Sequence, residues 1–299
     1  MLALGVALRE LGVEVVASWG GEPFEVPEAY AFLPALELLV PPEQFPVAPE
    51  LLVTLDTGSA DRLGSLADRV GTAGCTIVID HHATGATYGD LRLVDDRSAA
   101  TVVLVAELLD RLGVALTRET ATPLYTGLVT DTGSFKYAAT TPSVHALAGR
   151  LLATGIRHDL ISRSIYDTAP FGYVQVLGRA CGRACLEPAA AGGLGLVWTV
   201  VLAEDLERTG VGLAAIEGVI DVLRTTREAE VAVVLKADPV EGGWKVSTRS
   251  KGVLDVGAVC ALFGGGGHRF AAGFTATGAA EDVIDTVRKA LATAAHLTP

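Results

Sequence analysis

Cysteines, basic residues and long apolar runs are scarce in this sequence, and each scarcity excludes a class of protein. The four cysteines are too few to form a disulfide scaffold in a chain of 299 residues. We therefore expect reduced thiols and a cytoplasmic protein. No apolar run approaches the ~18 residues that cross a membrane, and the apolar residues 1–8 lack the basic leader of a signal peptide. We expect no membrane association.

Basic residues number 23 against 35 acidic ones, which gives a formal net charge of −12. This excess by itself argues against an anionic ligand such as a nucleic acid. The charge is uneven, however: residues 1–150 carry 9 basic and 19 acidic side chains, whereas residues 221–270 carry 7 and 6. The acidic half can hold cations, and the balanced segment can meet an anion. For most of the carboxylates we expect nothing more than a solvated surface.

Half of the residues are hydrophobic and 19% are charged, so the chain has enough apolar material for buried cores. At about 150 residues per domain, the length predicts two domains. In the first half, short apolar runs alternate with helical stretches, a pattern typical of a parallel α/β sheet. The expected strands are residues 13–17, 51–55, 76–79 and 91–94. The expected helices are residues 98–112, 117–130, 142–153, 158–166 and 171–186.

Small, flexible residues at 187–193 predict a linker. Beyond it the elements alternate as in a mixed α/β unit. We expect strands at 194–202, 230–237 and 244–250, and helices at 213–224, 255–263 and 280–294. The sequence thus predicts an α/β protein, with a parallel-sheet domain at residues 1–187 and a smaller mixed α/β domain at residues 188–299.

Acidic residues and histidines follow the predicted strands of the first domain. They are Asp56 after residues 51–55, Asp80, His81 and His82 after residues 76–79, and Asp131 after an apolar helix. Because open parallel sheets bind ligands at the carboxyl ends of their strands, these side chains are placed to meet. Carboxylates together with imidazoles suit Mn, Fe or Zn. Singly, Asp56 is typical of a helix cap and Asp131 of a turn, whereas two adjacent histidines have little packing use.

A run of four glycines followed by His268 is the second strong motif. Glycines such as Gly265 and Gly266 let a backbone approach a ligand closely, and their N–H groups can form an anion-binding nest. His268 and the nearby Arg249 can add charge-assisted hydrogen bonds to a phosphate. The plain alternative is a flexible loop between a helix and a strand.

These motifs stand in the order found in the DHH phosphoesterase family, which the chain resembles over nearly its whole length. They are Asp56, the triplet Asp80-His81-His82, GLVTDTG at 127–133, STRSK at 247–251 and GGGGH at 264–268. The chain is most similar to the branch of oligoribonucleases and 3′-phosphoadenosine-5′-phosphate phosphatases. This resemblance implies a DHH domain followed by a DHH-associated, substrate-binding domain.

The resemblance also implies a role for each residue of the motifs. Asp56 is similar to the carboxylate that bridges two metal ions, and His81 and Asp131 are similar to ligands of one of them. His82 resembles the histidine that contacts the scissile phosphate, and Asp80 would support the histidines; these two are the catalytic candidates. In the second domain, the residues that match those holding the terminal nucleotide or phosphate are Arg249, Gly265, Gly266 and His268.

The activity that this resemblance implies is hydrolysis that depends on Mn²⁺, with two ions in the family and Mg²⁺ or another divalent ion as an alternative. The expected substrates are short oligoribonucleotides, cleaved to mononucleotides, and 3′-phosphoadenosine 5′-phosphate, cleaved to AMP. A homodimer is left open. The alternatives are a phosphodiesterase for cyclic di-AMP or its linear dinucleotide, and a catalytically degenerate nucleotide-binding protein.

One motif of the family is missing at the start of the chain. A His and an Asp-x-Asp loop should precede the helix that begins at Met1, yet no Asp precedes Asp56 and no His precedes His81. We expect that the protein begins further upstream, and that an internal Met was taken as its start, rather than that the site is degenerate. This chain should then bind metal poorly and hydrolyse slowly, whereas an upstream-extended chain should be active.

Overall fold

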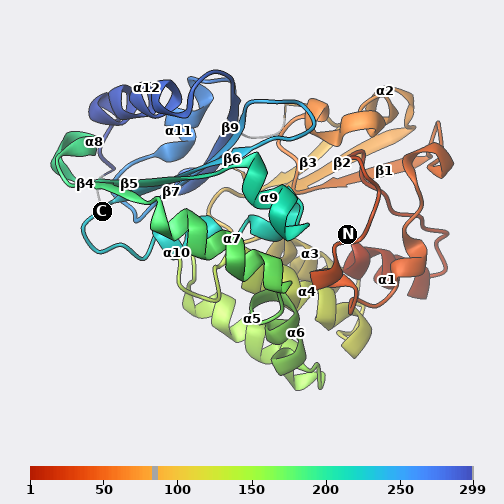
Figure 1. Cartoon of the computed structure of the whole chain (residues 1–299). Coiled ribbons are helices and arrows are strands. Elements are labelled where there is room, and N and C mark those ends of the chain that lie inside the picture. The colour runs from red at the N-terminus through yellow and green to blue at the C-terminus, as the bar shows by residue number, and fades with distance from the viewer. Residues whose placement is uncertain (83–86, 298–299) are drawn as a thin grey trace. The chain divides into compact units, whose positions relative to one another are not determined.

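The structure is a computed structural model that describes residues 1–82 and 87–297. The chain divides into two compact units, residues 1–168 and 169–299. In the described residues, each unit contains one sheet, of three strands in the first and six in the second (Figure 1). The predicted class, α/β with a parallel sheet followed by a mixed α/β unit, is confirmed.

The sheet of the first unit is entirely parallel, in the order β1-β2-β3. Its strands are β1 (Leu51–Leu55), β2 (Cys75–Asp80) and β3 (Leu91–Val94). The register pairs Leu55 with Ile79 and Asp80 with Val94. All three strands therefore end at the same edge of the sheet, and the residues that follow them leave from that edge.

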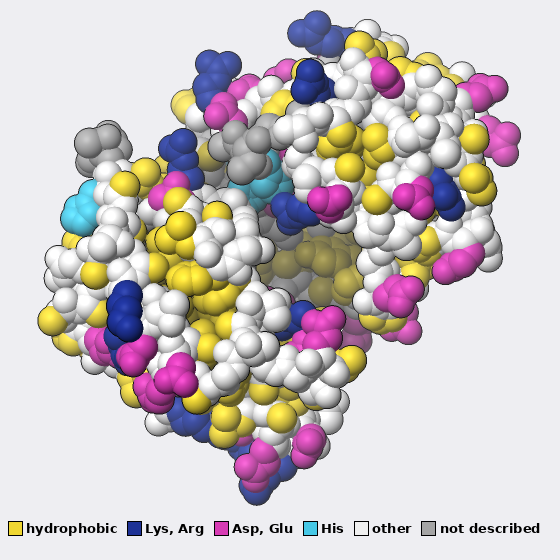
Figure 2. All heavy atoms as spheres, turned by 90° about the horizontal axis from the view of Figure 1, so that it is seen from above, with side chains coloured by type: hydrophobic (Ala, Val, Ile, Leu, Met, Phe, Trp, Pro, Cys, Tyr) yellow, Lys and Arg dark blue, Asp and Glu magenta, His cyan; other side chains and the backbone are white. Residues whose placement is uncertain are grey.

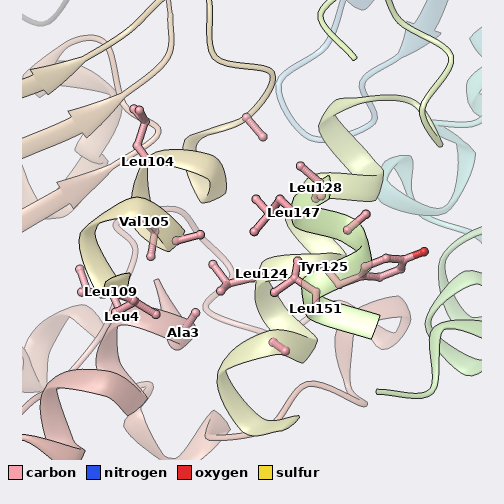
Figure 3. Packing of buried hydrophobic residues seen from close by; sticks show 14 of the residues in the cluster. Ala3, Leu4, Leu104, Val105, Leu109, Leu124, Tyr125, Leu128, Leu147 and Leu151 are labelled. Carbon is pink, nitrogen blue, oxygen red and sulfur yellow. The ribbon is translucent and has the colours of Figure 1, made fainter. Parts of the chain in front are cut away.

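Helices build most of the core of this unit. They are α1 (Leu2–Glu10), α2 (Arg69–Thr72), α3 (Thr101–Arg111), α4 (Arg118–Asp131), α5 (Pro142–Ala153) and α6 (His158–Tyr166). Figure 3 shows how α3, α4 and α5 interlock through leucines, with Leu109, Leu124 and Leu151 completely buried. A reciprocal capping box between Thr117 and Thr120 starts α4. Because α4 is held along its length, its last residue, Asp131, has a fixed position.

The strand predicted at residues 13–17 is wrong. Ala17 alone forms an isolated bridge, to Leu39, and the segment is otherwise irregular. Val13 and Val16 are exposed. The apolar run therefore does not mark a buried strand; Ala17 only joins a small cluster with α1 and a short helical turn at Leu36–Leu38.

The second unit has a mixed sheet in the order β4-β5-β6-β7-β9-β8, with only β5 and β6 parallel. Its strands are β4 (Cys185–Glu187), β5 (Leu196–Val201), β6 (Val231–Ala237), β7 (Trp244–Ser250), β8 (Gly266–His268) and β9 (Ala271–Ala276). Its helices are α7 (Phe171–Gly182), α8 (Ala190–Gly193), α9 (Ala203–Thr209), α10 (Val219–Leu223), α11 (Val256–Ala261) and α12 (Ala280–Thr293).

Helices cover the two faces of this sheet unequally. One face packs along its length against α11 and α12. The other face packs against α7, α9 and α10. Of the strands, β5 and β6 supply the described residues of this second core, such as Val201 and Val234. The part of that face made by β9 and β8 is consequently more open, whereas Arg249 of β7 lies 3.8 Å from Asp221 of α10.

The boundary between the units differs from the predicted one. It lies before α7 rather than after residue 187, because Val176 and Ala180 of α7 are buried with Val197 and Val201 of β5. The predicted linker at 187–193 belongs to the second unit, where it contains the end of β4 and the short helix α8. Its Ala191 is 2% exposed and packs in the core.

Within the described ranges, none of the helices combines the length and the apolar character that crossing a bilayer would require. Figure 2 shows acidic side chains spread over one face of the molecule rather than gathered in a single patch. This agrees with the expectation that most carboxylates are simply solvated.

Candidate metal and phosphate site

Asp56 leaves β1 by an abrupt turn. Its backbone N–H donates to the carbonyl of Ile79 at 3.0 Å, which ties the end of β1 to β2. Its φ is 61°, in the left-handed region that Asp and Asn tolerate better than most residues. The turn places the Asp56 carboxylate beside the residues that follow β2.

Asp80 is completely buried and binds to the two histidines that follow it. Its Oδ1 accepts the backbone N–H groups of His81 at 2.7 Å and His82 at 3.2 Å, and lies 2.6 Å from His82 Nδ1. A carboxylate can only accept here, so His82 Nδ1 carries the proton. These contacts orient both histidines, which is the role the family resemblance implies for Asp80.

His81 is held in the tautomer that can bind a metal ion. Its Nδ1 lies 3.1 Å from the backbone carbonyl oxygen of Ser98, which can only accept, so Nδ1 carries a proton, and in the neutral ring Nε2 has the lone pair. That Nε2 faces two carboxylates, 3.4 Å from Asp56 Oδ1 and 3.9 Å from Asp131 Oδ2.

The donor atoms of Asp56, His81 and Asp131 all lie within 4.8 Å of one another. One imidazole nitrogen with two carboxylate oxygens is a donor set that suits Mn, Fe or Zn. Asp56, Asp80 and His82 also meet this distance criterion. In that second group, however, Asp80 and His82 are hydrogen-bonded to each other, so the first group fits a divalent cation better.

Asp131 is the last residue of α4, where a negative charge is unfavourable because it meets the negative end of the helix dipole. Desolvation of this partly exposed carboxylate, together with the nearby Asp56 carboxylate, raises the pKa of Asp131 to about 6. A bound cation would offset both the unfavourable helix dipole and the repulsion from Asp56. A carboxylate at residue 131 therefore suits ligand binding better than it suits stability.

The backbone after Asp131 turns sharply, with three consecutive residues in the left-handed region: Gly133, Ser134 and Phe135. The hydroxyl of Thr132 accepts the N–H of Phe135 at 3.0 Å and holds this turn. A Cβ on Gly133 would lie 2.4 Å from the Tyr137 ring, so only glycine fits. The turn thus follows Asp131, which itself ends the helix, and it is strained, as is common beside functional groups.

Two further residues contact this cluster, and the sequence did not predict either of them. They are Ser98, through its carbonyl, and Thr101, whose hydroxyl donates to Asp56 Oδ1 at 2.7 Å. Their sequence signal is a Ser and a Thr at the start of an apolar helix, which is typical of a helix start and does not indicate a ligand.

In the second unit, Arg249 and His268 share one face of the sheet. Ala271 of β9 pairs with Arg249 of β7 on one side and with His268 of β8 on the other. Directly paired residues point to the same face, and two strand spacings separate these backbones by about 10 Å. The next row on this face is Ser247, Gly273 and Gly266. The small side chains leave a shelf between Arg249 and His268, which we call the β7–β9–β8 shelf.

The glycine run is not the flexible loop or the four-residue nest that the sequence allowed. Gly264, with φ of 74°, and Gly265 end α11 by donating their N–H groups to the carbonyls of Ala261 and Cys260. The remaining residues form β8. A Cβ on Gly265 would lie 2.2 Å from the Gly273 carbonyl oxygen, whereas one on Gly266 would meet nothing within 4 Å. Within β8, Gly266 is therefore open to a ligand, whereas the neighbouring Gly265 is not.

Comparison with known proteins matches residues 6–128 to the DHH family, N-terminal domain, and residues 199–295 to the DHHA1 domain. The bifunctional oligoribonuclease and PAP phosphatase NrnA of Thermus thermophilus is 35% identical over 301 residues, covering 99% of this chain and 86% of that protein. The protein of the same name in Bacillus subtilis is 25% identical over 228 residues, covering 75% of this chain and 69% of that protein.

Among solved structures, an exopolyphosphatase-related protein from Bacteroides fragilis matches with a TM-score of 0.86. Its sequence is 22% identical, and the match covers 97% of this chain and 86% of that one. This match supports the fold alone.

Proposed function

The chain belongs to the DHH family of phosphoesterases, and we propose that it hydrolyses short oligoribonucleotides to mononucleotides and 3′-phosphoadenosine 5′-phosphate to AMP. The observation that carries the proposal is the convergence of Asp56, His81 and Asp131 donor atoms within 4.8 Å. The Thermus relative, similar over nearly the whole of this chain, supports the choice of substrates.

The proposed cofactor is Mn²⁺, with Mg²⁺ or another divalent ion as the alternative. Asp56, His81 and Asp131 would hold one ion, and Asp56, with its two carboxylate oxygens, would also reach a second. A divalent ion bound there supplies an activated water at neutral pH and neutralises charge on the phosphate. His81 contributes by presenting Nε2 in a fixed direction, since Ser98 holds its other nitrogen.

His82 and Asp80 are the proposed catalytic pair. Because Asp80 binds Nδ1 of His82, the other ring nitrogen, Nε2, is the one that can contact a phosphate oxygen. When His82 is protonated, the buried carboxylate of Asp80 stabilises its positive charge, and Nε2 can then donate a proton to the leaving oxygen.

Arg249, Gly265, Gly266 and His268 are the proposed substrate-binding residues. Arg249 and His268 border the β7–β9–β8 shelf, where a phosphate or a nucleotide can lie over small residues without a steric clash. Gly266 would allow close approach of the ligand, and Gly265 would maintain the backbone path that makes this possible.

We also propose a cytoplasmic location, because all four cysteines are free and two of them, Cys181 and Cys185, are exposed. A homodimer stays a prediction, which sedimentation of the purified protein tests.

The decisive experiment incubates the purified protein with Mn²⁺ and three substrates: the linear RNA dinucleotide pApA, 3′-phosphoadenosine 5′-phosphate and cyclic di-AMP. Chromatography should show AMP from the first two, released slowly, as expected for a chain without the family's first His and Asp-x-Asp motif. The double variant His81→Ala/Asp131→Asn should lose turnover, and His158→Ala, which changes an exposed histidine of α6, should keep it. Unchanged turnover in the double variant would overturn the proposal. Preferential cleavage of cyclic di-AMP would favour that substrate instead.

A further inference from the structure

The Asp56 carboxylate needs support that its own backbone does not give. It follows the last residue of β1, and its side chain is 51% exposed. A half-exposed carboxylate can rotate about its side-chain bonds, and each rotation would move its oxygens away from His81. A precise donor set therefore requires a second residue that fixes this side chain.

Thr101 supplies such a contact. Its hydroxyl donates to Asp56 Oδ1 at 2.7 Å, and the residue itself is 5% exposed. A buried, β-branched side chain in a helix has few rotamers available, so its hydroxyl direction is well defined. The contacted oxygen is the one that lies 3.4 Å from His81 Nε2. A carboxylate oxygen can accept at two positions, so Thr101 takes one and leaves the other for the ion.

The same short segment also controls the second ligand. Three residues before Thr101, the carbonyl oxygen of Ser98 holds His81 Nδ1. The segment between them is rigid, because Ala99 and Ala100 are buried and the Ser98 hydroxyl donates to the Ala100 carbonyl at 3.0 Å. Residues 98–101 thus join ligands that follow two different strands.

We propose that Thr101 is a positioning residue that fixes the Asp56 carboxylate for the metal ion, an inference that rests on the proposed function. The Thr101 hydroxyl does not bind the ion itself. It restricts the rotation of the Asp56 side chain, which is the proposed ligand. Its loss should weaken ion binding by about 10- to 100-fold, the usual effect of removing an outer partner of a metal ligand.

The test measures the Mn²⁺ dissociation constant by calorimetry in Thr101→Val, which preserves the shape of the side chain and removes the hydroxyl. Thr101→Ala removes it without the β-branch, and Thr101→Ser restores it. Thr126→Val is the matched control, because Thr126 is equally buried and its hydroxyl binds only a helix carbonyl. Melting temperatures without metal show that the variants fold.

We expect Thr101→Val and Thr101→Ala to bind Mn²⁺ more weakly, and Thr101→Ser and Thr126→Val to bind it as the parent protein does. Normal affinity in Thr101→Val would overturn the inference. So would a loss in Thr126→Val as large as that in Thr101→Val, because the effect would then come from core packing.

Asp56→Asn separates failure of this inference from failure of the proposed function. If Asp56→Asn binds Mn²⁺ normally, Asp56 is not a ligand and the proposed metal site itself is wrong. If Asp56→Asn loses binding while Thr101→Val does not, only the positioning role is wrong. A double-mutant cycle should show coupling, since Thr101 has nothing to orient once Asp56 is replaced.

Discussion

At the scale of single residues, three aspartates with the same side chain occupy three different environments. Asp80 is buried and accepts three hydrogen bonds on one oxygen. Asp56 is half exposed and receives one hydroxyl. Asp131 ends a helix, and burial beside Asp56 raises its pKa to about 6. The environments, not the residue type, separate an orienting carboxylate from two that can hold a cation.

Replacing His82 by Ala should lower kcat by about 100-fold or more, because the ring that would contact the phosphate is lost. Mn²⁺ affinity should change little, since the donor set of Asp56, His81 and Asp131 is retained. Steady-state kinetics and calorimetry on the same variant measure the two quantities. Loss of Mn²⁺ binding in His82→Ala would instead show that His82 is a ligand.

At the scale of elements, β8 changes the interpretation of the glycine run. Adjacent glycines have opposite surroundings there: a Cβ at position 265 collides with β9, and a Cβ at position 266 meets open space. Gly265 allows the backbone to pass close to β9, and Gly266 is available to a ligand.

Gly265→Ala should therefore lower the melting temperature and weaken substrate binding together, because β8 must move away from β9. Gly266→Ala should keep the melting temperature of the parent protein and raise KM alone, since its new methyl group projects into the space proposed for the ligand. Thermal melts and kinetics of the two variants test this contrast. Equal melting temperatures for both would contradict the collision at residue 265.

The start of α9 is fixed by the carboxylate of Asp205, which accepts the N–H of Leu202 at 3.1 Å and pairs with Arg183 at 2.8 Å. The pKa of Asp205 is lowered, chiefly because Arg183 donates hydrogen bonds to its carboxylate. The Leu202 N–H and the positive charge of Arg183 add to this effect, and together they outweigh the opposing effect of burial. A lowered pKa means that the ionised carboxylate stabilises the folded state above the ordinary aspartate pKa. This stabilisation is lost as the pH falls below about 4.

Asp205→Asn should accordingly destabilise the protein by about 1.5–3 kcal/mol at neutral pH, the range for hydrogen bonds to charged groups. The difference from the parent protein should shrink as the pH falls below the ordinary aspartate range. Glu204→Gln is the control, because Glu204 is 61% exposed. Denaturant titrations across the acid range measure the free energy of unfolding of both variants. If the difference between Asp205→Asn and the parent protein stayed constant with pH, the ionic contribution of Asp205 would be contradicted.

Sequence patterns predicted the regular elements well where local signals agreed. Helices α5 and α6 and strands β1 and β3 lie at the predicted bounds. The failures have a common cause, namely tertiary contacts that no local pattern records. Residues 13–17 look like a strand but have no neighbouring strand to pair with in the described part of the chain. The run at 264–268 looks like a loop, but its residues 266–268 pair with β9.

The candidate site was only partly predictable, again because local patterns do not record tertiary contacts. Strand-end positions indicated that Asp56 and His81 would meet, because parallel strands end at one edge. Asp131 ends a helix instead, and its place beside them was implied by the family resemblance. The orienting contacts of Ser98 and Thr101 were not predictable, since they depend on how α3 packs beside that edge. The second-unit shelf depends on the register between β7, β9 and β8, which the sequence does not specify.

At the scale of the whole molecule, the proposed metal ligands all lie in the first unit and the proposed substrate-binding residues all lie in the second. Each unit has a core of its own. Cation binding and nucleotide binding should therefore leave separate signatures.

Hydrogen exchange measured by mass spectrometry tests this separation. Mn²⁺ alone should slow exchange at the ends of β1, β2 and α4, because the ion ties these ends together. AMP without metal should slow exchange in β7, β8 and β9. Protection by Mn²⁺ that extended equally through both units would contradict the assignment of all ligands to residues 1–168.

The strip of small residues between Arg249 and His268 has a practical consequence. Ala271 lies in its middle and already carries a Cβ on this face, so a larger or differently charged side chain could be introduced there without rebuilding the acidic centre. Gly273 does not offer the same choice, because a Cβ there would lie 2.7 Å from the carbonyl oxygen of Val246. Retargeting this hydrolase to another phosphorylated compound would thus begin with Ala271 of β9.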